Sequence, residues 1–117
     1  MLDIKSIVYE KNGICLLKIN IDDENKIFYN GILKVINNEV IFEYLKNLFN
    51  IIDGWKNEYI EISLIDGDIW KLSISYKNGN IVEYKGRSNY PSNFEAFVRL
   101  NEKLISEGIG GHAGYWF

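Results

Sequence analysis

Residues 69–85 read IWKLSISYKNGNIVEYK, and this stretch determines the fold class. Apolar and polar side chains alternate from Trp70 to Tyr76, which is typical of a strand with one buried face. Asn78-Gly79 marks a turn, and the chain then returns in a second alternating run. The stretch therefore predicts an antiparallel hairpin whose apolar side chains face a core.

The length of the connection at Asn78-Gly79 decides which side chains share a face, because a slip of one residue inverts a strand. A two-residue turn would place the apolar residues of the two strands on opposite faces. A three-residue connection keeps the apolar face whole, with Ile74 opposite Val82 and Leu72 opposite Tyr84. We therefore predict a type I turn followed by a glycine bulge.

The same argument applies at two other turns, Lys11-Asn12-Gly13 and Asp66-Gly67-Asp68. The pairs that it predicts are Tyr9 with Cys15, Ile7 with Leu17, Leu64 with Trp70, and Ile62 with Leu72. Cys15 then shares a face with Leu17 and Ile19, and buried free cysteines behave as small apolar residues. We therefore expect Cys15 in the core.

Further strands and two helices are predicted on either side of this hairpin. The strands are expected at 4–10, at 14–21, at 26–36 with an interruption at Gly31, and at 60–64. Asn37-Asn38 offers an N-cap to a first helix, which carries a one-sided apolar stripe and closes at Asp53-Gly54. Ser92 with Glu95 matches a capping box for a second helix that ends at Gly108.

The predicted order is βββα-βββα, which indicates one two-layer α+β domain over 1–117, with an antiparallel sheet and both helices on one face. The two halves also resemble each other, since a shift of 55 positions (69 − 14) places Ile14 on Ile69. An internal repeat with units 4–54 and 57–108 would put a pseudo-twofold axis between the halves. The alternative is a similar order of elements without duplication.

Composition indicates an ordinary globular domain. The 117 residues are 47% hydrophobic and 25% charged, with a net charge of −3, and this length suits a core without metal or disulfide. The lysines are scattered among acids rather than clustered, so no nucleic-acid partner is expected. A lone cysteine, no signal-peptide pattern and no long apolar run predict a cytoplasmic protein with no membrane partner. Heavy use of Ile, Asn and Lys is typical of an AT-rich bacterial or phage genome.

No pattern in the sequence predicts a catalytic, cofactor or metal site. His112 is the sole histidine, and it has no orienting acid or nucleophile near it in the sequence. The acidic turns Asp22-Asp23-Glu24 and Asp66-Gly67-Asp68 lack the spacing of a calcium loop. Residues 108–113 match G-x-G-x-x-A, but that fingerprint works between a strand and a helix, not after a helix. We therefore expect no catalytic residue, no cofactor and no metal.

Two segments are candidates for contact with a partner. The candidate residues are Arg87, Asn89, Tyr90, Tyr115, Trp116 and Phe117. The first three precede the second helix, where backbone amides can bind an anion, or they only direct the chain into that helix. The last three close a Gly-rich tail over 108–117, which either folds back over the sheet or a helix end, or docks on a partner.

The second half of the chain also carries a spaced pattern. Its elements are Asp66-Gly67, Trp70, Leu72, Ile74, Tyr76, Asn78-Gly79, Gly86, Asn89, Tyr90-Pro91 and Asn93-Phe94, with Trp55 upstream. This pattern resembles one in small uncharacterised proteins of low-GC Gram-positive bacteria. Where such proteins often have Gly-Ser-Asn, this chain has Gly-Arg-Ser-Asn at 86–89. The resemblance supports the fold and implies no activity.

These observations favour a non-enzymatic binding domain, monomeric or homodimeric, that docks on another protein as a small inhibitor or immunity protein does. Compact size, mild acidity and 15% aromatic residues support this hypothesis. The alternative is a small-molecule or peptide sensor, with a pocket between sheet and helices or strand addition at a sheet edge. An enzyme would need catalytic side chains that only the fold brings together.

Overall fold

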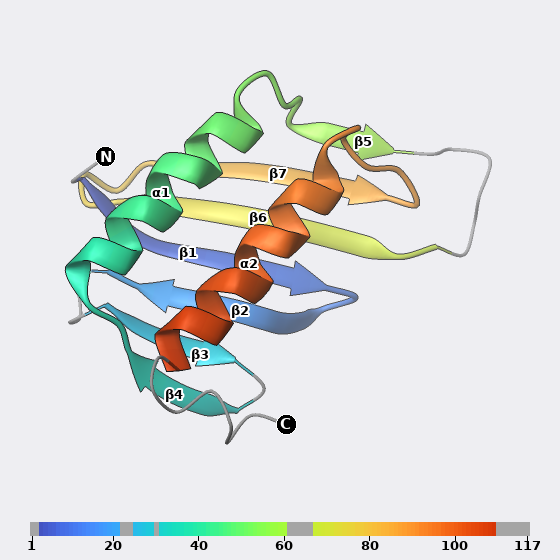
Figure 1. The fold of residues 1–117 in the computed structure, drawn as a ribbon. Helices are drawn as coiled ribbons and strands as arrows, with labels where there is room; N and C mark the ends of the chain where they lie inside the picture. Colours follow the sequence, from blue (N-terminus) through green and yellow to red (C-terminus); the bar gives the residue numbers. More distant parts are fainter. Residues whose placement is uncertain (1–2, 22–24, 30, 61–66, 110–117) are drawn as a thin grey trace.

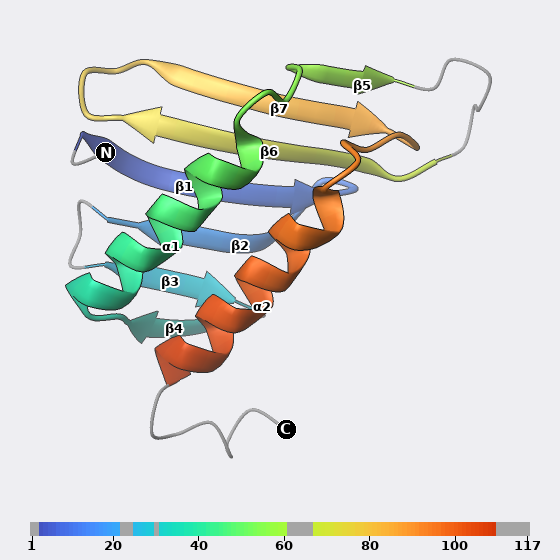
Figure 2. The same cartoon turned by 45° about the horizontal axis from the view of Figure 1, so that its top comes forward.

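The computed structural model describes residues 3–21, 25–29, 31–60 and 67–109 of the chain. The elements are β1 (Ile4–Lys11), β2 (Ile14–Asn20), β3 (Lys26–Tyr29), β4 (Ile32–Val35), α1 (Asn38–Ile52), β5 (Glu58–Ile60), β6 (Ile69–Tyr76), β7 (Ile81–Arg87) and α2 (Phe94–Ile109). The described strands form one sheet in the order β4-β3-β2-β1-β6-β7-β5. Both helices lie across the same face of this sheet (Figures 1 and 2), which confirms the predicted two-layer α+β arrangement.

The β6–β7 hairpin has the predicted register, with Ile74 opposite Val82 and Leu72 opposite Tyr84. The Gly79 amide donates to the Tyr76 carbonyl over 3.0 Å, and Gly79 has a φ of +95°. A type I turn followed by a glycine bulge has this geometry. The three-residue connection is therefore confirmed.

The turn between β1 and β2 differs from the prediction. It contains two residues, Asn12 and Gly13, whose φ values of +53° and +78° are those of a type I′ turn. The observed pairs are Ile7 with Ile19, Tyr9 with Leu17, and Glu10 with Cys15. Both predicted pairs at this turn are therefore wrong.

The pairing of β1 with β2 differs from the prediction because β2 contains a β-bulge, in which Leu16 is the extra residue. The bulge returns Leu17 to the core face despite the shorter turn. Cys15, on the turn side of the bulge, is exposed. The prediction that Cys15 lies in the core is therefore wrong.

The single strand predicted over 26–36 is a hairpin of β3 and β4. Tyr29 pairs with Ile32 across a two-residue connection, and Gly31 in that connection has a φ of +77°. Gly31, which was expected to interrupt a strand, instead lies in the turn that reverses the chain, because glycine adopts the left-handed conformation without steric cost. The order of elements is therefore ββββα-βββα, not βββα-βββα.

The extra strand also changes the direction of the first helix relative to the second. Tyr44 contacts Asn101, whereas Trp55 contacts Asn93, so α1 and α2 run antiparallel. The strands that a repeat would equate, β2 and β6, are parallel because each is antiparallel to β1. One rotation cannot relate both the parallel strands and the antiparallel helices, so the internal repeat is not confirmed.

β5 lies at the edge of the sheet rather than beside β6. It pairs with β7 in parallel, with Tyr59 opposite Gly86, so the sheet is mixed and the prediction of a purely antiparallel sheet is wrong. The expected partners Ile62 and Leu64 lie outside the described residues. Their predicted partners Trp70 and Leu72 pair with β1 on one side and with β7 on the other.

The helices begin where the sequence predicts, although one cap differs. The Asn37 side chain caps α1 by accepting a hydrogen bond of 2.9 Å from the Val40 amide. Glu95, expected to complete a capping box, instead accepts a hydrogen bond of 2.6 Å from Arg99 one turn later in α2. The helix α2 also continues past Gly108.

The core between the helices and β6–β7 is centred on Trp70. Its indole is fully buried, and Nε1 donates to the Asn89 carbonyl over 2.9 Å. Four aromatic rings have centroids between 4.9 and 6.2 Å from it, those of Trp55, Tyr59, Tyr90 and Phe94. Asn93 joins the two helices beside this cluster, because it accepts from Trp55 Nε1 and donates to the Ile51 carbonyl.

Candidate protein-binding surface

The sheet face that points away from the helices, here called the outer face, is not covered by any described element (Figures 1 and 2). Residues directly opposite each other on neighbouring strands share a face. On β3 the core residue Ile27 separates Lys26 from Phe28, so these two point to the outer face. Their partners on β4, Val35 and Leu33, point there as well.

Phe28, Leu33 and Val35 form an apolar group on the outer face, here called the β3–β4 patch. Their side chains are 39%, 50% and 61% exposed, in that order. An open depression of about 330 Å³ continues the patch, and it is lined by Cys15, Lys18, Phe28, Tyr29 and Gly31. Contiguous exposed apolar side chains beside such a depression are typical of an interaction site.

The centre of the outer face is charged and internally paired. Lys71 on β6 lies 3.6 Å from a Glu10 carboxylate oxygen on β1 and 3.8 Å from one of Glu83 on β7. Exposed pairs of this kind contribute about 0–1 kcal/mol each to stability. Their alternating signs differ from the clustered basic side chains of phosphate-binding surfaces. The apolar corner at β3–β4 therefore differs in chemistry from the centre of the face.

The structure separates the candidate residues of the loop before α2. Arg87 is opposite Ile69 on the outer face and is exposed. Tyr90 lies on the helix side, where its ring stacks on Trp70 with centroids 6.1 Å apart and planes 13° apart. The Asn89 side chain accepts a hydrogen bond of 3.0 Å from the Tyr90 amide. These contacts hold the loop against the core and do not bring Arg87 and Tyr90 into one site.

Several residues considered from the sequence lie outside the described part of the chain. They are His112 and the tail residues Tyr115, Trp116 and Phe117. Among the acidic turns, Asp68 is described. It accepts a hydrogen bond of 3.2 Å from Asn12 and lies 3.5 Å from Lys11, and these neighbours lower the pKa of its carboxyl group. Within the described residues, no three His, Cys, Asp or Glu side chains converge to hold a metal ion.

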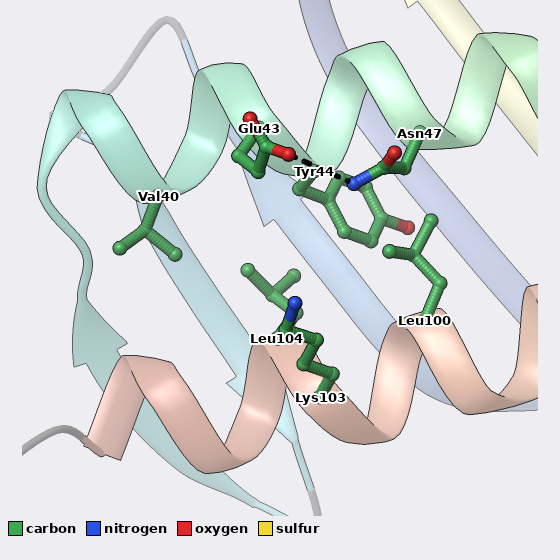
Figure 3. A pocket seen from close by; sticks show the side chains of 7 residues that line it. All are labelled: Val40, Glu43, Tyr44, Asn47, Leu100, Lys103 and Leu104. Atoms are coloured by element: carbon green, nitrogen blue, oxygen red, sulfur yellow. Dashed lines mark hydrogen bonds between the residues drawn. The ribbon is translucent and has the colours of Figure 1, made fainter.

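A narrow pocket lies between α1 and α2 (Figure 3). Its volume is about 10 Å³, which is room for about one water molecule. The Tyr44 hydroxyl donates a hydrogen bond of 2.7 Å to Asn101 Oδ1, and Asn101 Nδ2 has no partner among the described residues. The pocket is a packing feature of the helix pair rather than a space for a ligand.

We expect Tyr44→Phe to reduce the loss of stability at alkaline pH. Burial raises the pKa of the Tyr44 hydroxyl above its ordinary value of 10.0, so above this pH the unfolded chain releases a proton that the folded chain retains. Folding stability then falls by up to about 1.4 kcal/mol per pH unit as the pH rises. Urea unfolding between about pH 9 and about pH 11 measures this slope. Tyr29→Phe, which removes a tyrosine hydroxyl elsewhere in the chain, is the control. Equal slopes of stability against pH for wild type and Tyr44→Phe would contradict the expectation.

A further hollow lies where α1 begins. Its volume is about 190 Å³, and it is lined by Ile21, Asn25, Asn38, Ile41, Phe42, Leu45 and Lys77. The buried Asn25 donates from Nδ2 to Asn38 Oδ1 in its wall. Pockets that bind small molecules usually measure about 300–1,000 Å³. This hollow is therefore small for the sensor function considered as the alternative.

The β3–β4 patch was missed from the sequence, although a local signal for it exists. Asn30-Gly31 stands between two apolar runs, and Asn-Gly in this setting favours a two-residue hairpin.

Neither described helix has the length and apolar character needed to span a lipid bilayer. Comparison with known proteins gives no matching family model, no similar curated protein and no similar solved structure.

Proposed function

We propose that this chain is a small non-enzymatic binding domain that docks on another protein through the β3–β4 patch, in the manner of an inhibitor or immunity protein. The observation that carries the proposal is the apolar patch itself, formed by Phe28, Leu33 and Val35 on a sheet face that no described element covers. Burial of apolar and aromatic side chains provides much of the free energy of protein association.

The form of the described surface supports docking over ligand binding. The hollow at the start of α1 is about 190 Å³ and the pocket between the helices about 10 Å³, both below the usual range for a small-molecule site. Two depressions on the outer face, of about 330 and about 410 Å³, reach that range, but they are open rather than enclosed. The patch joins the smaller of these depressions, which lies over β2, β3 and Gly31. A protein surface can cover such a shape, whereas a small molecule would leave most of it in water.

Val35→Glu and Ile81→Glu form a matched pair of variants for testing this surface. Val35 and Ile81 are both β-branched, both 61% exposed and both on the outer face, but only Val35 belongs to the patch. With tagged chain and a lysate of the native host, wild type and Ile81→Glu should capture the same protein. Val35→Glu should bind that protein at least about tenfold more weakly, a loss of about 1.4 kcal/mol.

Thermal unfolding of both variants serves as the control for folding. Exposed strand positions tolerate such changes within about 0.5 kcal/mol, so both should melt close to wild type. Equal capture by wild type and Val35→Glu would contradict the proposed surface, whatever the result for Ile81→Glu.

A further inference from the structure

The backbone of β4 has hydrogen-bonding groups that β3 does not use. In an antiparallel pair, residues alternate between those bonded to the partner strand and those whose N–H and C=O point away from it. The Ile36 amide donates to the Asn25 carbonyl over 3.1 Å, which sets the alternation along this hairpin. Counting back from Ile36, Lys34 is bonded to β3, whereas Leu33 and Val35 direct their N–H and C=O groups outward.

This edge differs from the opposite edge of the sheet. β4 ends the described sheet on one side, and β5, with three residues and the exposed Glu58, ends it on the other. Natural edge strands are protected from further pairing by charge or short length. β4 has four residues and carries Lys34, but Lys34 is opposite the core residue Ile27 and so lies on the helix side, which leaves only apolar side chains on the outer face of β4. On β4, Leu33 and Val35 carry both the outward backbone groups and the exposed apolar side chains. This is the arrangement that β-strand addition uses, with backbone bonds for affinity and side chains for selectivity.

We propose that the docking partner supplies an extended segment that pairs with β4 and adds a strand to this sheet. The inference rests on the proposed function and specifies the kind of partner. Segment residues on the outer-face side would lie beside Leu33 and Val35, because facing residues on adjacent strands share a face. Those segment residues should be apolar.

A charged residue near the patch indicates which kind of side chain the partner should place there. Lys18 is exposed on the outer face directly opposite Phe28. Its strand β2 is two strands from β4, about 10 Å away, so a partner that covers the patch beyond its added segment would meet this lysine. An acidic side chain is the complementary group there.

A second copy of this chain is a poorer occupant of the edge. The register that pairs Leu33 with Val35 of the second copy places the two Lys34 residues opposite each other, and like charges directly opposite destabilise a strand pair. The registers that pair Leu33 with Leu33 or Val35 with Val35 avoid this contact. In all three registers β4 brings a lysine and no acidic side chain, so a segment of different sequence that carries an acidic side chain is the better complement.

Val35→Pro and Val35→Thr separate the backbone contribution from the side-chain contribution. Threonine keeps the shape of valine but replaces one methyl group with a hydroxyl, whereas proline keeps an apolar ring but removes the outward N–H. Proline is tolerated at edge positions whose N–H is not used within the sheet. Against the protein captured by wild type, Val35→Thr should bind about fivefold more weakly. Val35→Pro should bind at least about tenfold more weakly than Val35→Thr. Thermal unfolding checks that both variants remain folded.

Amide hydrogen exchange of wild type provides the second measurement. In the free chain the Leu33 and Val35 amides should exchange fast and the Lys34 amide slowly, and all three should be slow in the complex. Equal weakening by Val35→Thr and Val35→Pro would overturn strand addition while leaving the docking surface intact. Wild-type affinity in both variants would instead overturn the proposed surface.

Two further outcomes concern other occupants of the edge. Slow exchange at Leu33 and Val35 in a dilute free chain, lost when 110–117 is deleted, would assign the edge to the chain's own C-terminal segment and overturn the inference. Slow exchange that depends on protein concentration, with a dimer in size-exclusion chromatography, would assign it to a second copy and overturn it equally.

Discussion

Replacing Trp70 with alanine should lower the free energy of unfolding by about 3–5 kcal/mol, the usual range for a buried aromatic residue. The indole is fully buried and packs against four aromatic rings. Truncation leaves a cavity and removes the N–H that donates to the Asn89 carbonyl. Small domains have only about 5–15 kcal/mol of stability in total, so the loss is large. Urea unfolding followed by circular dichroism measures it.

Ile69→Ala is the matched control for Trp70→Ala. Ile69 is the preceding residue of β6, points to the outer face and is 47% exposed. Its truncation removes an apolar side chain from the same strand without a buried cavity, and should cost about 1 kcal/mol or less. Equal losses in the two variants would show that the faces of β6 are assigned wrongly.

Gly86→Ala should produce the second large loss, about 3 kcal/mol, at the upper end of typical overpacking. A Cβ at Gly86 would overlap Trp70 Nε1 and would lie 2.5 Å from the Asn89 carbonyl oxygen and 2.7 Å from the Tyr59 carbonyl oxygen. Two of these atoms belong to the backbone, so no side-chain rotation relieves the overlap. The melting temperature should fall by about 10 °C.

Lys85→Ala tests whether this loss reflects the crowded site. Lys85 is the neighbouring residue, exposed on the outer face, and its replacement should change stability by about 0.5 kcal/mol or less. Combining Gly86→Ala with Trp70→Phe removes one of the three overlaps but leaves both carbonyls, so recovery should be partial. A Gly86→Ala variant as stable as Lys85→Ala would contradict the close packing of β5 and the loop against β7.

The β6–β7 hairpin was predictable because alternation and turn length constrain its register together. The same reasoning failed between β1 and β2, because the bulge at Leu16 changes the parity within a strand, and one extra residue leaves no mark in composition. β5 was misplaced for a different reason. Its pairing with β7 is a long-range contact, which local pattern in a three-residue strand does not specify.

The candidate surface was predictable only in part. Asn30-Gly31 signals a two-residue hairpin that would place Phe28 opposite Leu33, so the apolar pair could be inferred locally. The position of β4 at the edge of the sheet depends on the order of all strands, so it could not be inferred from local sequence. Arg87 and Tyr90 are close in sequence, but the positive φ of +53° at Ser88 accompanies a change of direction between them. Their closeness in sequence therefore did not mean that they form one site.

A methyl NMR titration of the chain with its captured partner tests the docking surface most directly. Leu33 and Val35 report on the patch, whereas Val40 and Leu100 line the pocket between the helices, on the other side of the sheet (Figure 3). Docking at the patch predicts that the Leu33 and Val35 methyl resonances shift while those of Val40 and Leu100 stay unchanged. Shifts at Val40 and Leu100 with none at Leu33 and Val35 would put the partner on the helices and contradict the proposed surface.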